Sequence, residues 1–407
     1  MPSKSSLSVR LLVTLCSFAQ DATCNNSITQ FWGAYSPFFT QGTYAAPPYG
    51  CHIDQMNLLQ RHGARFPIAG ASPSIVSAIG KLQNVQNYTD PRLYFLKDFT
   101  YNLGEDVLVP FGAQQSFETG GLAFKRYEAL ISTINLPFVR ASSKARVVDS
   151  ANNWTAGFAA ASFHVYNPTL SVILSESAND TLDDSQCTDA GDSDDETDAW
   201  LAVFAPNITP RLNHWAPGAN VTDTDTYAIL SMRPFHTPLL RTVHHPEFAD
   251  FEYYMDLSKY YGTGYGAYLS RVQGVGYINE LIARLTDTAV NDSTQTNGTL
   301  DASPAAFPLN RTLYADFSHD DEMVAVYSAM GLFNISSPLD PTKYAATWVA
   351  SHLVPFSARM VVERLTGEPL EFCAQKDAPG ICEVGAFVES QTYARSGGDG
   401  DWQKCYA

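Results

Sequence analysis

Positive charge is scarce in this chain of 407 residues. Lysine and arginine together number 25 against 42 aspartates and glutamates, which gives a formal net charge of −17. Nucleic acid binding needs a basic face, and this composition excludes it. The chain also lacks internal repeats, long linkers and, after its first residues, any apolar run long enough to cross a bilayer. Since 45% of the residues are hydrophobic, we expect a large globular protein that binds neither nucleic acid nor membrane.

Cysteine is also infrequent, with seven in the whole chain. Cys16 lies in the short apolar run Leu11 to Ala19, which follows Lys4 and Arg10 and is typical of a signal peptide. We expect cleavage after Ala19, which makes residues 1–19 the signal peptide. Six cysteines then remain to form disulfides in an oxidising compartment. Ten Asn-x-Ser/Thr sequons agree with a secreted, extracellular glycoprotein: Asn25, Asn87, Asn153, Asn179, Asn207, Asn220, Asn291, Asn297, Asn310 and Asn334.

Two short motifs carry the chemistry. The first, Gln60 to Pro67, sets His62 between Arg61 and Arg65 after an apolar segment. Arginine presents a planar set of donors that matches phosphate oxygens, and a neutral imidazole can accept a phosphoryl group. The second motif is His319-Asp320, which follows the apolar stretch 314–318 and precedes a helical pattern.

This pair of motifs resembles the double signature of the histidine acid phosphatases, and the chain is most similar to their secreted fungal phytases of the basidiomycete type. Further stretches carry the likeness over nearly the whole mature chain: 32–39, 138–142, 146–150, 259–264, 272–277 and 393–398. The resemblance implies an α/β fold with a mostly parallel central sheet flanked by helices, and a smaller, mainly helical inserted domain. The core is expected at about 45–75, 136–175 and 300–407, and the insertion at about 76–135 and 176–299, within a catalytic region of 20–407.

Periodicity agrees with a mixture of helices and strands. Apolar residues from Val275 to Leu285 recur at helical spacing, while Phe356, Ala358, Met360 and Val362 alternate as in a strand with one buried face. The active site is expected at the carboxyl ends of the core strands.

The resemblance implies roles for eight residues. His62 attacks the phosphorus, Asp320 protonates the leaving group, and Arg61, Arg65, Arg146 and His319 hold the phosphate. Lys259 and Tyr35 either contact further phosphates or are surface packing residues. Arg146, and not Arg140, matches the phosphate-binding arginine of the family.

The implied function is hydrolysis of phytate and other phosphate monoesters through a phosphohistidine, by a monomer without a cofactor. A broad acid phosphatase, or an inactive secreted glycoprotein, are the alternatives. The acidic stretch Asp183 to Asp198 lacks the spacing of a calcium loop, and His236, His244 and His245 have no further ligand at metal spacing. No metal site is therefore expected.

The chain departs from the family in several places. The resemblance implies bridges Cys373–Cys382 and Cys187–Cys405, whereas Cys51 either pairs with Cys24 or both stay free. Segments near 234–246 and 366–370 look shortened. Ile68 and Asp321 stand where fungal phytases often carry Thr and Asn, which affects the finer substrate contacts.

Overall fold

The computed structural model describes residues 7–13, 28–42, 44–232, 244–367 and 381–407. Its centre is a seven-stranded sheet of order β4-β3-β5-β2-β6-β1-β7. The strands are β1 (Ser8–Val13), β2 (Cys51–Arg61), β3 (Phe138–Ser142), β4 (Leu170–Leu174), β5 (Leu313–Ser318), β6 (Arg359–Gly367) and β7 (Ile381–Glu383).

The α/β prediction is confirmed, with one refinement to the sheet. Strands β4, β3, β5 and β2 are parallel to one another, whereas β6, β1 and β7 are joined by antiparallel pairing. The sheet is therefore mixed, and its parallel half holds the strands that lead into both sequence motifs.

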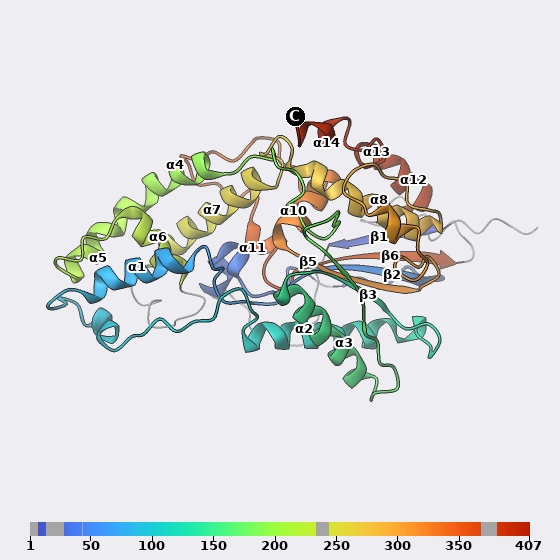
Figure 1. Cartoon of the computed structure of the whole chain (residues 1–407), viewed down its shortest axis with the longest axis horizontal. Helices are drawn as coiled ribbons and strands as arrows, with labels where there is room; N and C mark the ends of the chain where they lie inside the picture. Colours follow the sequence, from blue (N-terminus) through green and yellow to red (C-terminus); the bar gives the residue numbers. More distant parts are fainter. Residues whose placement is uncertain (1–6, 14–27, 43, 233–243, 368–380) are drawn as a thin grey trace, which may run out of the picture.

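Helices cover both faces of the sheet (Figure 1). On one face lie α2 (Pro110–Tyr127) and α3 (Ala145–Ala161), and on the other lie α8 (Val275–Thr286) and α10 (Asp320–Ala329). The predicted helical spacing from Val275 corresponds to α8. Two helices at the C-terminal end, α12 (Val384–Ser390) and α13 (Thr392–Arg395), lie beside α8, and the chain ends after α14 (Asp401–Lys404).

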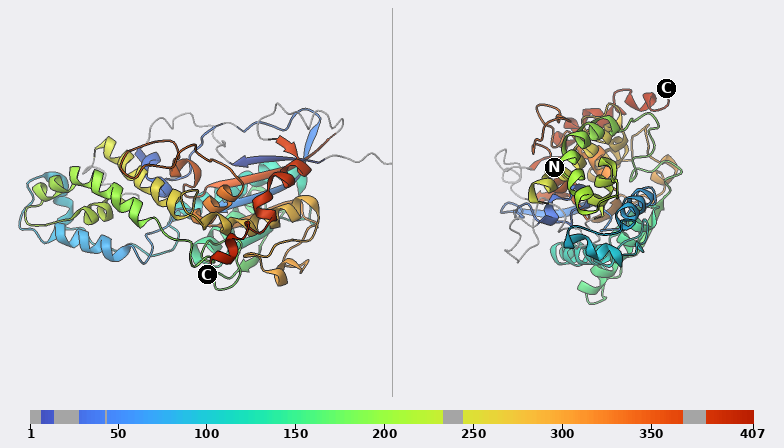
Figure 2. Two further views of the ribbon diagram at one scale, coloured as in Figure 1. Left: turned by 90° about the horizontal axis from the view of Figure 1, so that it is seen from above. Right: turned by 90° about the vertical axis from the view of Figure 1, so that its left-hand side faces the viewer.

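A second group of helices extends beyond the end of the sheet, as Figure 1 and the left view of Figure 2 show. It contains α1 (Ser72–Gln83), α4 (Asp194–Phe204), α5 (Thr209–Trp215), α6 (Asp223–Ser231) and α7 (His245–Gly262). The remaining α-helices of the described residues are two short ones, α9 (Gly298–Asp301) and α11 (Ala350–Leu353). The division into a core and a helical insertion at the boundaries given above stays a prediction.

Successive side chains of the central strands point to opposite faces of the sheet and join two different apolar clusters. Leu58 packs with α2 and α3, while its neighbour Leu59 packs on the opposite face. In β6, Val361 joins the first cluster and Met360 and Val362 join the second. The expectation of one buried face for this strand is therefore wrong, because helices cover both sides of the sheet and bury successive residues of β6.

Strand β1 lies inside the segment expected to be a signal peptide. It pairs with β6 from Ser8↔Leu365 to Val13↔Met360, and Ser8 to Arg10 also pair with β7. The signal peptide itself stays a prediction.

The disulfides differ in part from expectation. Cys187 and Cys405 form the predicted bridge. Cys51 is disulfide-bonded, so it is not free; Cys24 lies outside the described residues. Cys382 carries a free thiol at the exposed strand β7, so the expected bridge to Cys373 is not formed here; Cys373 itself lies outside the described residues.

Candidate active site

The two motifs meet because their strands are neighbours. Strands β2 and β5 pair in parallel, with Arg61 opposite Ser318, and the amide of His62 donates to the carbonyl of Ser318 at 3.0 Å. His62 and His319 thus leave the same edge of the sheet, and their ring centroids lie 5.7 Å apart. This is the carboxyl end of the parallel strands, where the sequence predicts the site.

The backbone fixes the tautomer of His62. Nδ1 lies 2.8 Å from the carbonyl oxygen of Gly63, an acceptor only, so Nδ1 carries the proton and donates. Nε2 is then the nitrogen with a free lone pair. It is buried and has no hydrogen-bond partner within the described part of the chain. This nitrogen is available to attack an electrophile.

The surroundings of His62 keep it neutral. Burial of the ring, and then the positive charges of Arg61, Arg65 and Arg146 with His319, hold its pKa well below the ordinary value. A neutral imidazole at acid pH is a competent nucleophile, whereas a free histidine would be mostly protonated there.

Arg61 is completely buried and has one half of its guanidinium bound to the protein. Nη1 donates to the carbonyl oxygens of Ala34 and Val354. Nη2 lies 3.2 Å from an oxygen of Asp320, but neither Nη2 nor Nε makes a well-aligned hydrogen bond within the described residues. Half of this planar donor set therefore remains for an anion.

Two further arginines approach His62 closely enough to lower its pKa. Arg65 anchors Nη1 on the carbonyl of Phe66 at 3.0 Å, and Arg146, in the first turn of α3, lies 3.3 Å from Asp106. The Nε atoms of both are buried and lack a partner among the described residues. Burial and the charge of Arg65 lower the pKa of Arg146. Three partly unsatisfied guanidinium groups around one imidazole make a site for an anion with several oxygens.

His319 is held by acids that the sequence reasoning did not identify. Its Nε2 lies 3.2 Å from Glu176 and 3.8 Å from Asp183, while Nδ1 lies 3.4 Å from Nη2 of Arg146. Although burial acts to raise it, hydrogen bonds from His319, Lys144 and Ser142 lower the pKa of Glu176 to about 2. Glu176 is thus an anion that fixes the orientation of the His319 ring.

Asp320 is the first residue of α10; His319 occupies the N-cap position, and its side chain makes no capping hydrogen bond. The carboxylate lies 2.7 Å from Nζ of Lys259 on α7, and Lys259 also contacts Asp321 at 2.6 Å. Burial would raise the pKa of Asp320, but the charges of Arg61 and Lys259 overcome it and hold the pKa well below the usual range.

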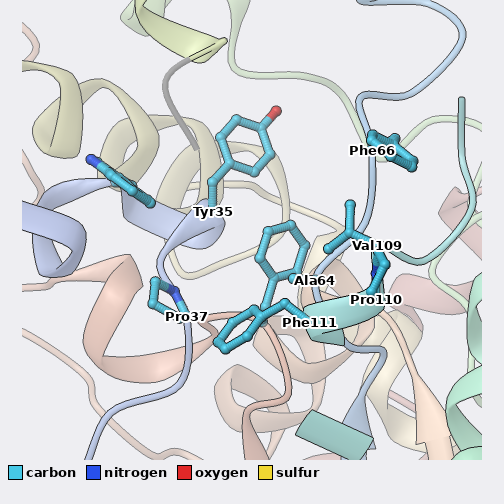
Figure 3. Close-up of a pocket in the computed structure, with 9 residues that line it drawn as sticks. Tyr35, Pro37, Ala64, Phe66, Val109, Pro110 and Phe111 are labelled. Atoms are coloured by element: carbon cyan, nitrogen blue, oxygen red, sulfur yellow. The ribbon is translucent and has the colours of Figure 1, made fainter. Parts of the chain in front are cut away.

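Tyr35 lines a cavity of about 370 Å³ next to the first motif (Figure 3). Its ring stacks on Phe356 with centroids 6.1 Å apart, and Phe356 also lies 4.5 Å below the guanidinium of Arg61. In Figure 3, Tyr35 and Pro37 lie on one side of this cavity and Phe66 and Val109 on the other.

Arg140 has a structural position. It is buried in strand β3, where it binds Asp316 at 2.8 Å and Glu280 at 2.5 Å. Arg284 binds the same Asp316. All four side chains are buried, so Arg140 neutralises carboxylates in the core, and Arg146 is the arginine that approaches His62.

Only one group of at least three described side chains has metal-ligand geometry. It consists of Glu176, Asp183 and His319, whose ligand atoms lie within 4.8 Å of one another. Glu176 already accepts from Ser142 at 2.9 Å and pairs with Lys144 at 2.8 Å, so its charge is compensated by the protein.

Comparison with known proteins agrees with this geometry. The sequence profile of the histidine phosphatase superfamily (branch 2) matches residues 52–379. The chain belongs to this family.

Among its relatives, Phytase A of Aspergillus awamori is 36% identical over 436 aligned positions, which cover 94% of this chain and 92% of the relative. Phytase A of Arthroderma benhamiae is 37% identical, over 94% of this chain and 93% of its own. Both alignments, the second over 429 positions, are longer than the 407 residues of this chain, so both relatives carry residues that this chain lacks.

The fold is shared with solved structures of low sequence identity. The phytase of D. castellii superimposes with a TM-score of 0.71 at 17% identity, over 94% of this chain and 90% of that one. The multiple inositol polyphosphate phosphatase of Bifidobacterium longum, in its complex with inositol hexasulfate, gives 0.57 at 13% identity, covering 88% of this chain and 96% of that protein.

Proposed function

We propose that the protein hydrolyses phosphate monoesters of phytate through a phosphohistidine on His62. The observation that carries this proposal is the buried, unpartnered Nε2 of His62 among three arginines with unused donors. The names of the fungal relatives supply the substrate, since both are phytases.

The reaction proceeds in two displacements. Nε2 of His62 attacks phosphorus in line, the bond from phosphorus to the ester oxygen breaks, and the leaving alkoxide takes a proton from Asp320. Water then attacks the phosphorus, the bond to Nε2 breaks, and inorganic phosphate leaves. Arg61, Arg65, Arg146 and His319 compensate the charge on the equatorial oxygens in both steps.

Asp320 is ionised in the free enzyme, so it has to acquire the proton that it donates. A phosphate that binds beside Arg61 brings negative charge and competes for the cations that stabilise the Asp320 carboxylate. Binding of the substrate at acid pH therefore favours protonation of Asp320. Lys259 forms ion pairs with Asp320 and Asp321. Together with Tyr35, it is also proposed to contact other phosphates of the substrate.

We also propose that the protein is secreted and acts as an extracellular, monomeric glycoprotein. Nine of the ten sequon asparagines are described, and none of these nine is buried. Within the described residues, no helix combines the length and hydropathy that a bilayer crossing requires.

Phosphate release from phytate and from p-nitrophenyl phosphate at acid pH tests the function. We expect turnover of phytate by the parent enzyme and none by His62→Ala. Release from p-nitrophenyl phosphate alone would favour a broad acid phosphatase, and release from neither would mean an inactive glycoprotein.

A further inference from the structure

A second cavity lies between α2, the first residues of β6 and the segment of residues 38–40. Its volume is about 270 Å³, and its wall is mostly apolar, with the side chains of Phe38, Phe39, Phe111 and Leu122. Of the described residues, only Phe111 also lines the cavity that contains Tyr35. Within the described chain, none of the side chains placed at the phosphate site lines the second cavity. A ligand bound there would therefore leave the phosphate site free.

The second cavity contains a buried cation that has no counter-ion among the described residues. Arg359 lines the cavity and is 8% exposed, and its Nε atom makes no hydrogen bond within the described segments. Burial, and then the charge of Arg126, lower the pKa of Arg359 to about 9, and no described carboxylate acts in the opposite direction. Arg359 is therefore charged at acid pH and has lost water without gaining an anion, which is a costly arrangement.

Arg359 and Ser357 both have donors available to a ligand of this cavity. The guanidinium carbon of Arg359 lies 3.9 Å from the centroid of the Phe38 ring, a contact that offers no oxygen acceptor to the N–H groups. The hydroxyl of Ser357, which also lines the cavity, accepts from Nε2 of Gln60 at 3.2 Å, so its own hydrogen is left to be donated. A guanidinium and a hydroxyl in one cavity match the two oxygens of a carboxylate.

The rest of the wall selects an anion that has one charge and an apolar body. Glu118 also lines the cavity, and Arg359 is the only basic residue among the described ones that line it. A phosphate dianion would therefore meet repulsion that one guanidinium does not offset. The aromatic and aliphatic side chains, in contrast, suit a flat apolar group. These features favour a monocarboxylate with a ring over an inorganic anion or a polyphosphate.

We propose that the second cavity binds small aryl monocarboxylates, with the carboxylate on Arg359 and Ser357 and the ring among the apolar side chains. The site lies outside the catalytic site, and the proposal does not rest on the function proposed above. Binding stabilises the folded protein, because the ligand supplies an anion to a buried guanidinium that has none among the described residues.

Calorimetric titration of the parent protein with benzoate, above the pKa of benzoic acid, tests the site. We expect one benzoate per chain with a Kd on the order of 0.1 to 1 mM, as for one charged contact and one buried ring. Benzamide has the same ring without the charge and should bind about tenfold more weakly or less well still. Saturating vanadate, which the arginines around His62 would hold, should leave the Kd for benzoate unchanged.

Arg359→Met should weaken benzoate binding by about tenfold or more, because the charged contact is lost. Its midpoint of thermal unfolding without ligand should equal or exceed that of the parent, since an uncompensated buried charge is removed. Arg395→Met is the matched control, because Arg395 is exposed on α13 and does not line the cavity. Its Kd for benzoate should equal that of the parent.

Three results with the parent protein alone would overturn the site: no binding of benzoate, equal binding of benzamide, or loss of benzoate binding in vanadate, which would place the ligand at the catalytic arginines. An unchanged Kd for benzoate in Arg359→Met would overturn it as well.

Discussion

At His62 the contacts that keep the imidazole neutral also orient it. The Gly63 carbonyl fixes the proton on Nδ1, and burial among arginines disfavours a second proton on Nε2. The same cations form the phosphate site, so a bound phosphate partly cancels the field that keeps His62 unprotonated.

Asp320→Asn should slow phytate hydrolysis by a factor on the order of 10² to 10⁴, because asparagine cannot protonate an alkoxide. With p-nitrophenyl phosphate, whose leaving group needs no proton, the loss should be much smaller. Steady-state kinetics on both substrates provide the measurement. Asp321→Asn is the control, since Asp321 contacts the same Lys259 at 2.6 Å. Equal losses in the two variants would show that only the ion pair with Lys259 matters.

Glu176→Gln should lower kcat/KM for phytate about tenfold, because the neutral amide no longer holds His319 with a full charge. The measurement is kcat/KM for phytate, determined for the parent and the variant across acid pH. Glu389→Gln removes an exposed carboxylate elsewhere and should leave the profile unchanged. A profile for Glu176→Gln that matches the parent would exclude a positioning role.

Among elements, the start of helix α2 sets the position of the loop after His62. Ala64 donates from its amide to Gln115 of α2 at 3.0 Å, and Gly63 donates to Ser150 of α3 at 3.0 Å. A Cβ atom added to Gly112 would collide with the backbone of Ala64. The first motif is thus packed directly on two helices.

Gly112→Ala should therefore destabilise the fold by about 1 to 3 kcal/mol and reduce activity as well, because the loop of residues 62–65 has to move. Thermal unfolding and phytate kinetics test both effects. Gly121→Ala on the same helix meets only ordinary contacts at 3.5 Å and beyond, and should be neutral or slightly stabilising. An equally mild effect of Gly112→Ala would contradict the close packing.

Features that follow from a local pattern, such as an apolar strand that ends in a polar motif, could be predicted from the sequence. Both motifs follow apolar stretches, and these stretches became β2 and β5, so the meeting of His62 with His319 and Asp320 was accessible to sequence reasoning. Glu176 and Asp106 were missed because both lie outside helices and strands, without local pattern, and Glu176 is 143 positions from its partner His319. The two-sided burial of β6 was missed because helices distant in sequence cover it.

The end of the sheet that β1 and β7 form could not be predicted either. Strand β1 comes from the segment expected to be removed as a signal peptide, and cleavage after Ala19 would take it away. In the cleaved chain β7 would lose its described partner, and β6 would become the edge of the sheet.

At the scale of the whole molecule, the buried carboxyl groups predict that the free energy of unfolding is greatest at acid pH. Burial raises the pKa of Asp180 and of Glu252 to about 7, and raises that of Glu322 well above its usual value. In the unfolded chain the pKa values of these groups are about 4. Between these values the folded state binds more protons, so the stability that they contribute is full below about pH 4 and is lost as pH rises through about 7.

The carboxylate of Asp316, whose pKa is lowered, causes stability to fall at the lowest pH. Despite burial, the charges of Arg140 and Arg284 hold the pKa of Asp316 at about 2, so its contribution is lost as pH falls from about 4 through 2. We therefore expect the free energy of unfolding to be greatest between about pH 3 and 5.

Denaturant unfolding from pH 2 to 9 measures this profile. Glu322→Gln should flatten the decline above pH 4, because Glu322 is completely buried with a raised pKa, and glutamine cannot ionise. A free energy of unfolding that increases steadily from pH 4 to 8 in the parent protein would contradict the expected profile.

The covalent step on His62 is tested most directly by trapping the intermediate. The enzyme is mixed with p-nitrophenyl phosphate labelled in its phosphoryl group, denatured within milliseconds, and digested for peptide mapping. We predict up to one acid-labile, base-stable phosphate per chain, located on the peptide that contains His62 and absent from His62→Ala. Label on another residue, or the same labelling of His62→Ala, would contradict the account.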